Sequence, residues 1–379
     1  MIDLAAARET FEDSTDYTVG IEEEFALLDP GTNLLAPRFE LLRDAAQSDP
    51  VLAESIAGEL ISSEIEIRSG RGEDVADARA RQADRRHRLF TLAAAHGVAL
   101  GSTGTHPLSD YREQHIIDTE HYHRVEDGLK YVAWRNNTFS VHVHVGIRGA
   151  DRAVLVCDRL RPILPLLLAI SANSPYVDKM DSGLHSARTQ TFTKSFPRCG
   201  VPDAFGSWQA WADYVELLVR TQSIVEFTQL WWSVRPHHDF GTVEVRICDA
   251  QTTGEEADQL AALIVACVRR AAEEVDAGET PPEVPGRLIE ENMWRAIRYG
   301  LDGSLLDLEA PRIEPFPAAE AVDRLRAWSG ADVVLPELNG AQRQRRMIAA
   351  GATPAEVYAE CLRETQATYL QETCDEPAA

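Results

Sequence analysis

Apolar and charged residues alternate along several short segments of the chain. In TVEVRICD, at residues 242–249, valine and isoleucine occupy one parity, and Glu244 and Arg246 occupy the other. Successive side chains of a β-strand point to opposite faces, so one face would be apolar and the other would carry a carboxylate and a guanidinium. The segment therefore predicts a strand whose charged face either is solvated or lines a polar cavity.

Four other segments have the composition of strands. Residues 17–28 (YTVGIEEEFALL) alternate and end at the turn sequence DPGTN, and residues 60–68 (LISSEIEIR) alternate again. Residues 137–147 (NTFSVHVHVGI) give the clearest strand pattern in the chain. Residues 98–107 (VALGSTGTHP) predict a strand that runs into a glycine-rich loop.

Helical periodicity begins at residue 74 and continues to about 95, where Gly97 follows as a candidate C-terminal cap. A helix over 150–171 should be kinked or split by the prolines at 162 and 165. Further helices are expected near residues 255–275, 287–300, 317–328, 338–350 and 354–372.

Residues 172–207 are rich in Ser, Gly, Pro and Arg and have little periodicity. A loop of this length is more often functional than accidental. Strands that do not alternate regularly with helices favour an α+β fold with a mostly antiparallel sheet, in a single domain over residues 1–379.

The formal net charge of −24 argues against a nucleic-acid partner, because phosphate binding requires a basic surface. The sequence has no 18-residue apolar run and no recognisable signal peptide, so we expect a soluble cytoplasmic protein without a membrane partner. Six dispersed cysteines are typical of buried thiols rather than of disulfides. The apolar segment at 261–268 is compatible with either the core or a homo-oligomer contact.

Carboxylates recur on the charged faces of the expected strands. Glu22 and Glu24 share one face, about 7 Å apart, and Glu66 lies on the next acidic strand with Glu59 just upstream. Each strand alone is compatible with a solvated face, but the recurrence favours a common site. Oxygen-rich sites of this kind suit Mg²⁺ or Mn²⁺ better than zinc.

The expected strand SVHVHVGI directs His142 and His144 to one face. Such a pair can bind zinc, as in a zinc hydrolase, but no third His or Cys has metal-ligand spacing. Glu244 can take a divalent ion, and Arg246 can bind phosphate bidentately. A polar face with several carboxylate-held ions and arginines is what phosphoryl transfer from a nucleotide triphosphate requires, although the sequence has no P-loop motif.

Seven segments resemble, in order, the motifs of the type 2 glutamate–cysteine ligases, a family of carboxylate–amine ligases; they are YTVGIEEEFALLDP, GSTGTHP, VHVHVGI, SANSPY, FGTVEVRICDAQT, ENMWRAIRYGLDG and LNGAQRQR. The resemblance extends from about residue 17 to residue 350. It implies a glutamine-synthetase-like antiparallel sheet that forms a half-funnel. It also implies that ATP and Mg²⁺ are used to phosphorylate the γ-carboxylate of glutamate, after which an amine displaces the phosphate.

The resemblance also implies roles for individual residues. The metal ligands would be Glu22, Glu24, Glu59 and Glu244, and the residues at the reacting centre would be Glu66, His142 and Arg246. Substrate and nucleotide contacts would come from Arg188, Arg198 and Arg235. The residue pattern adds His144, on the strand face of His142, and Thr105 and His106, in the loop GSTGTHP whose small residues let backbone N–H groups approach a ligand.

The sequence departs from the family pattern in two places. The approach to the histidines reads NNTFSVHVHVG, without the expected glycine, and Phe192, Thr193 and Lys194 replace a bulkier, tryptophan-bearing stretch. The second departure affects the segment expected near the acceptor amine, so cysteine is not assumed to be the acceptor. The alternatives are a ligase for another carboxylate or another amine, and a non-catalytic homologue that binds ATP and metal.

Overall fold

One antiparallel sheet organises the chain. The structure, a computed structural model, describes residues 3–279 and 283–370. The strands follow the order β2-β3-β1-β5-β9-β8, and β4 pairs with the far end of β1. Their bounds are β1 (Val19–Leu28), β2 (Ile56–Ala57), β3 (Glu64–Arg68), β4 (Ala99–Gly101), β5 (Ser140–Gly146), β8 (Val234–His237) and β9 (Thr242–Asp249).

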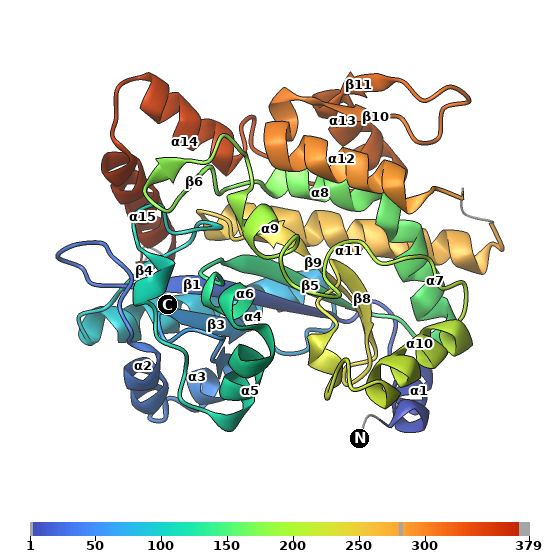
Figure 1. Cartoon of the computed structure of the whole chain (residues 1–379), viewed down its shortest axis with the longest axis horizontal. Coiled ribbons are helices and arrows are strands. Elements are labelled where there is room, and N and C mark those ends of the chain that lie inside the picture. Colours follow the sequence, from blue (N-terminus) through green and yellow to red (C-terminus); the bar gives the residue numbers. More distant parts are fainter. Residues whose placement is uncertain (1–2, 280–282, 371–379) are drawn as a thin grey trace, which may run out of the picture.

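Helices cover one face of this sheet (Figure 1). The long helices α4 (Val75–Ala95) and α11 (Gly254–Asp276) lie on it with α7 (Ala150–Leu160). Helix α8 (Leu164–Ser171) follows α7 in the chain and packs against the outer helix α12 (Gly286–Tyr299). The alternation of the strands explains this packing, since every second residue is apolar and buried against these helices. That leaves the charged parity on the opposite face.

The other helices surround the sheet or lie beyond its edges. They are α1 (Leu4–Glu12), α2 (Phe39–Ala46), α3 (Pro50–Ser55), α5 (Glu120–Leu129), α6 (Tyr131–Trp134), α9 (Ala187–Thr191), α10 (Trp208–Arg220), α13 (Ala318–Ser329), α14 (Gly340–Ala349) and α15 (Pro354–Leu370). The hairpins β6 (Tyr176–Val177)–β7 (Met180–Asp181) and β10 (Ser304–Leu306)–β11 (Pro315–Pro317) complete the fold.

The structure confirms the α+β class with a mostly antiparallel sheet. It also confirms that prolines split the helix expected at 150–171, because a 3₁₀ turn at Arg161–Ile163 separates α7 from α8. The strand expected at 60–68 is shorter and begins at Glu64. The helix expected at 354–372 extends to Leu370, and its last two residues lie outside the described part of the chain.

Several elements were not expected from the sequence. The helices α1, α5 and α10 and the short edge strand β8 lie in stretches for which the periodicity predicted no element. The segment 172–207 contains the small hairpin β6–β7 and α9 within a long irregular path. Short elements have weak periodic signals, and tertiary packing decides whether they form.

The carboxylate of Asp249, the last residue of β9, holds that irregular segment in place. One carboxylate oxygen accepts hydrogen bonds from the Asn173 backbone N–H at 2.9 Å and the Ser174 hydroxyl at 2.5 Å, and the other accepts from the Ser186 hydroxyl at 2.9 Å. Ser186 is also the N-cap of α9, which carries Arg188. The hydrogen bonds to the Asp249 carboxylate therefore fix Arg188 beside the charged face of the sheet.

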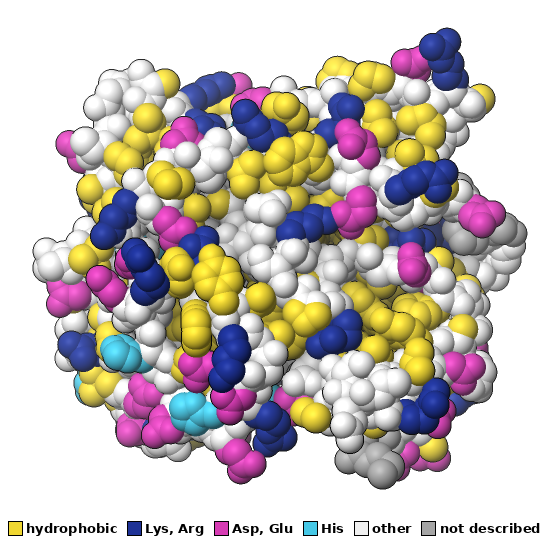
Figure 2. Space-filling view, in the orientation of Figure 1, with side chains coloured by type: hydrophobic (Ala, Val, Ile, Leu, Met, Phe, Trp, Pro, Cys, Tyr) yellow, Lys and Arg dark blue, Asp and Glu magenta, His cyan; other side chains and the backbone are white. Residues whose placement is uncertain are grey.

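None of the described helices is long and apolar enough to cross a lipid bilayer. Among the described residues on the face drawn in Figure 2, acidic and basic side chains are interspersed without a broad basic patch. The five cysteines within the described residues are unpaired thiols.

The sequence predicted that His106 contacts substrate or nucleotide. The structure corrects this expectation, because the His106 ring is bonded to backbone groups of the protein. The buried ring accepts the backbone N–H groups of Leu108 and Ser109 at Nδ1, at 3.1 and 2.9 Å, and Nε2 donates to the Asn33 carbonyl at 2.8 Å. These partners fix the neutral tautomer. Burial lowers the pKa of His106 to about 4.

Because His106 protonates more readily in the unfolded chain, its contribution to stability is fully present above pH 6.5 and is lost as the pH falls toward 4. We expect about 2 kcal/mol of the stability lost between pH 7 and pH 5 to come from this group. Urea unfolding at both pH values should show a smaller loss for His106→Gln than for the wild type. An equal loss in the two proteins would contradict this assignment.

Candidate active site

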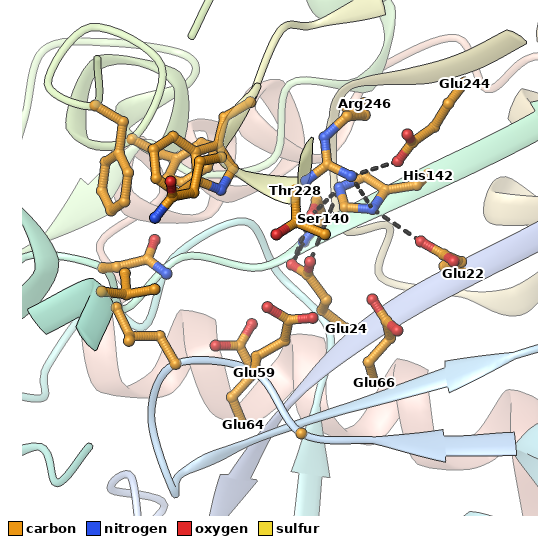
Figure 3. Close-up of a pocket in the computed structure, with 18 of the residues that line it drawn as sticks. Glu22, Glu24, Glu59, Glu64, Glu66, Ser140, His142, Thr228, Glu244 and Arg246 are labelled. Carbon is orange, nitrogen blue, oxygen red and sulfur yellow. Dashed lines mark hydrogen bonds and ion pairs between the residues drawn. The ribbon is translucent and has the colours of Figure 1, made fainter. Parts of the chain in front are cut away.

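The charged face of the sheet forms the floor of a cavity of about 340 Å³ (Figure 3). Eight acidic side chains and four arginines line it, so the acidic groups outnumber the arginines two to one. The carboxylates are Glu22, Glu24, Glu59, Glu64, Glu66, Glu226, Asp239 and Glu244, and the arginines are Arg68, Arg188, Arg235 and Arg246. Bound cations or protonation relieve the repulsion within such a set.

The register of the sheet brings these side chains together. Glu24 lies opposite Glu66 across the β1–β3 pair, and Glu22 lies opposite His142 across the β1–β5 pair. His144 is paired with Glu244 across β5 and β9. Residues directly opposite each other in a sheet have neighbouring side chains, so the register alone generates one continuous polar cluster.

Three groups of these residues have ligand atoms close enough to share one cation. Glu24, Glu59 and Glu66 form the first, and the other two centre on Glu22, with Glu66 and His142 or with His144 and Glu244. In each group the candidate ligand atoms lie within 4.8 Å of one another. The ligands of the first group are all carboxylates, so the donor set fits a hard divalent ion such as Mg²⁺ or Mn²⁺.

The pKa values of the acidic cluster indicate the same need for positive charge. Burial, with a contribution from the neighbouring Glu24, raises the pKa of Glu59 to about 7. Burial likewise raises the pKa values of Glu64 and Glu66 well above their usual range, with Glu24 and Glu22 as the next largest contributions respectively. One oxygen of Glu64 is buried without a hydrogen-bond partner. A bound cation would favour the ionised forms of all three.

Ser140 orients Glu24 at the centre of the cavity. Its backbone N–H and its hydroxyl each donate to the same Glu24 oxygen at 2.6 Å. Ser140 was not among the residues expected in the site. It begins the segment SVHVHVGI, however, and shares the strand parity of His142 and His144. The same parity rule would have added Arg68 and Glu64 to the site.

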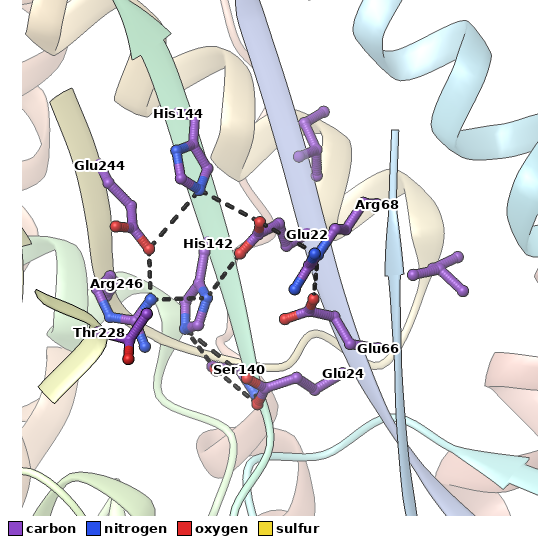
Figure 4. A network of polar contacts seen from close by, with 12 residues as sticks. Glu22, Glu24, Glu66, Arg68, Ser140, His142, His144, Thr228, Glu244 and Arg246 are labelled. Carbon is purple, nitrogen blue, oxygen red and sulfur yellow. Dashed lines mark hydrogen bonds and ion pairs between the residues drawn. The ribbon is translucent and has the colours of Figure 1, made fainter. Parts of the chain in front are cut away.

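Two histidines connect Glu22 to the rest of the cluster (Figure 4). A Glu22 oxygen lies 3.2 Å from His142 Nδ1, and the other lies 3.4 Å from His144 Nε2. Burial alone would raise the pKa of Glu22, but His144 and His142 lower it well below its usual value. Burial, helped by the Arg246 guanidinium, lowers the pKa of His142, which keeps that ring neutral and able to act as a ligand.

Arginines hold Glu244 from two sides. Arg235 Nε donates to one Glu244 oxygen at 2.5 Å, and Arg246 Nη1 donates to the other. Although burial would raise the pKa of Glu244, these two guanidinium groups lower it well below its usual range. Arg235 also donates to the Leu230 carbonyl at 2.6 Å, so it is held in place behind Glu244, whereas the Arg246 Nε atom has no partner.

Arg188 enters the cavity from α9. Its two terminal nitrogens donate to the backbone carbonyls of Ile247 and Arg246 at 3.0 and 3.3 Å, and its Nε atom is buried without a partner. The nearest carboxylate oxygen, on Asp249, lies 3.8 Å from Nη1. The guanidinium is therefore placed firmly but retains donor capacity for an anionic group.

The structure brings most of the predicted site residues to this cavity, but not all of them. His144 lies in the polar cluster and lines a neighbouring cavity. Thr105 is buried and donates its hydroxyl to the Tyr176 carbonyl at 2.8 Å, away from the cavity. Arg198 lies over the Trp231 ring and donates to the Gln229 carbonyl. Neither Thr105 nor Arg198 lines the cavity, which corrects the expectation that they contact substrate.

The fold belongs to a class represented by glutamate–cysteine ligases. It is similar to the Francisella tularensis glutamate–cysteine ligase solved in complex with AMP, with a TM-score of 0.69 at 11% identity over 95% of this chain and 91% of that chain. A bifunctional glutathione synthetase from Pasteurella multocida gives a TM-score of 0.66 at 12% identity, over 97% of this chain and 54% of that chain.

Sequence relatives identify the family. The family model for glutamate–cysteine ligase family 2 matches residues 18–376. A Rubrobacter xylanophilus protein that carries the name glutamate–cysteine ligase 2-2 is 37% identical over 369 residues, 95% of this chain and 94% of that protein. A Solibacter usitatus protein of similar name is 35% identical over 87% of this chain and 88% of its own length. The chain belongs to the glutamate–cysteine ligase family 2, as the resemblance indicated.

Metal binding to the carboxylate cluster should depend on pH. Below pH 7 a cation must displace the proton of Glu59, so the apparent affinity for Mn²⁺ should fall by up to about tenfold per pH unit from 7 to 6. Isothermal titration calorimetry at pH 6 and pH 8 measures this change. Glu59→Gln should weaken Mn²⁺ binding and reduce its pH dependence. The control Glu226→Gln alters a cavity carboxylate outside the three groups and should keep both the affinity and its pH dependence. Equal affinity at both pH values would contradict the assignment.

Ser140→Ala should lower Mn²⁺ affinity by roughly 10-fold, because outer hydrogen-bond partners of metal ligands typically contribute this much. The variant keeps the backbone N–H bond to Glu24 and loses the hydroxyl with its contacts to Glu24 and to His142 Nε2, the latter at 2.8 Å. Thermal unfolding of the metal-free protein serves as the control for a general loss of stability. Unchanged affinity would show that the backbone bond alone orients Glu24.

Proposed function

We propose that the protein is an ATP-dependent carbon–nitrogen ligase that joins the γ-carboxylate of glutamate to an amine through an acyl phosphate. The observation that carries the proposal is the cluster of carboxylates, histidines and Arg246 on one sheet face, within a chain that belongs to the glutamate–cysteine ligase family 2. Glutamate as the donor rests on the names of the relatives.

The metal sites would be formed by Glu24, Glu59 and Glu66 on one side and by Glu22, His144 and Glu244 on the other. Bound Mg²⁺, or Mn²⁺, would supply positive charge for the phosphates of ATP. Without such ions, the excess of carboxylates would repel a nucleotide triphosphate.

A second cavity of about 440 Å³ adjoins the first and supports a place for the nucleoside part of ATP. The two cavities share Glu22, Arg68, Asp239 and the exposed ring of Phe240. His144 lies on the wall of the second. Its remaining lining is mainly uncharged and includes Thr18, Gly20 and Thr242. The phosphates would then reach from this chamber to the metal cluster past Glu22.

Two arginines of the first cavity would bind the anionic groups of the donor and of the transferred phosphate. We assign the α-carboxylate of glutamate to Arg188, whose Nε atom is free, and the transferred phosphoryl group to Arg246. Arg235 fixes Glu244 and acts as a positioning residue.

The reaction would take two steps, phosphoryl transfer and then amide formation. A γ-carboxylate oxygen attacks the terminal phosphorus of ATP and the bond to ADP breaks, while Arg246 stabilises the charge on the phosphoryl oxygens. The amine nitrogen next attacks the acyl carbon, the carbon–oxygen bond breaks, and phosphate leaves as the nitrogen loses a proton. The cavity must exclude water during the first step, because an acyl phosphate hydrolyses readily.

Trapping with hydroxylamine tests the first step. With ATP, Mg²⁺ and glutamate, hydroxylamine should capture the acyl phosphate as a hydroxamate, and ADP should form in equal amount. Glu24→Gln should lower the rate at least about 100-fold, because it removes a metal ligand. The matched exposed variant Glu337→Gln should retain it. If neither glutamate nor any other carboxylic acid of a panel gave hydroxamate, the proposed function would be refuted.

A further inference from the structure

Part of the cavity lining is an aromatic wall. Phe192, Phe196 and Trp231 line it in sequence, with ring centroids 4.5 Å apart between the two phenylalanines and 5.4 Å apart between Phe196 and Trp231. Phe192 follows directly after α9, whose Arg188 we assign to the donor. The aromatic wall therefore adjoins the helix that carries the arginine assigned to the donor.

Apolar side chains from another part of the chain line the same cavity. Leu60 and Val125 line the cavity and belong to a small buried cluster with Ala133. Tyr122 lines it as well and donates its hydroxyl to the Gly58 carbonyl, so its ring is held in place beside Glu59. The space between the two walls thus suits a flat or branched apolar group.

The described lining of the cavity offers a second carboxylate no free lysine or arginine. Among the described residues that line the cavity, Arg188 is the one lysine or arginine not bound to a cavity carboxylate, and the donor would occupy it. His121 is paired with Glu226, at 3.1 Å between Nδ1 and a carboxylate oxygen. Arg198 lies over the Trp231 ring and is not part of the lining.

We propose that the acceptor is a primary amine that carries an aromatic or branched aliphatic group and no carboxylate; this inference rests on the ligase function proposed above. A second carboxylate enclosed in this cavity would lie among Glu64 and Glu226 with every arginine of the described lining already engaged, at a substantial cost in binding free energy. An amine without that group avoids the repulsion, and its apolar part would pack between Trp231 and Leu60. The carboxylates attract the ammonium form of such an amine to the site.

Matched pairs of acceptors test this inference. With ATP, Mg²⁺ and glutamate, ADP release is measured with 2-phenylethylamine against phenylalanine and with 3-methylbutylamine against leucine, two pairs that differ only by a carboxylate. Cysteine and methylamine complete the panel, and mass spectrometry identifies each amide. Each apolar amine should have a kcat/KM at least about tenfold above that of its amino acid and above that of methylamine.

Variants of the aromatic wall provide the second readout. Trp231→Ala should lower the preference for 2-phenylethylamine over methylamine by roughly tenfold, mainly through KM, because an aromatic contact is lost. The matched control Trp294→Ala alters an exposed tryptophan of α12, outside the cavity, and should keep the preference.

The outcomes distinguish a failure of the acceptor inference from a failure of the proposed ligase function. If hydroxylamine traps an acyl phosphate but phenylalanine, leucine or cysteine equals or exceeds the amines, the ligase function stands and the acceptor inference is overturned. A preference that Trp231→Ala leaves unchanged also overturns it. If no carboxylic acid gives a hydroxamate, the function and the inference fail together.

Discussion

The antiparallel register of β3, β1, β5 and β9 is the constraint on which the rest of the structure depends. It places Glu66 beside Glu24, His142 beside Glu22, and Glu244 beside His144, all on one face of the sheet. A shift by one residue in any strand would turn its charged side chains into the apolar layer under α11. The burial of valine, isoleucine and phenylalanine on the opposite face is therefore also what holds the charged cluster together.

The cluster concentrates more negative charge than its arginines balance, and the fold tolerates it through local arrangements. Glu244 is held between two guanidinium groups, Glu22 between two imidazoles, and Glu24 by two donors from Ser140. Glu59 and Glu64 lack comparable support, and burial raises their pKa values. The unbalanced part of the site is where cations are expected, so electrostatic strain and ligand binding are two aspects of one arrangement.

The sequence predicted the sheet and its reactive face well because strand periodicity acts over few residues. Alternation alone placed Glu22 with Glu24 and Glu244 with Arg246, and proline positions predicted the break between α7 and α8. Thr105 and His106 were assigned to substrate because small and polar residues in a glycine-rich loop resemble a ligand contact. In the structure their partners are backbone groups of distant segments, which no local pattern reveals.

By itself, the sequence determined the strand faces, the helix break and the family, since each depends on the order of residues along a short stretch or on motifs. Only the tertiary structure decided which walls meet across the cavity. Trp231 precedes β8, Phe192 follows α9, and Leu60 lies before β3, yet all three border one space. The physical reason is that register and packing between distant segments set these contacts, and the conformation of an irregular loop depends on partners such as Asp249 that lie far away in the chain.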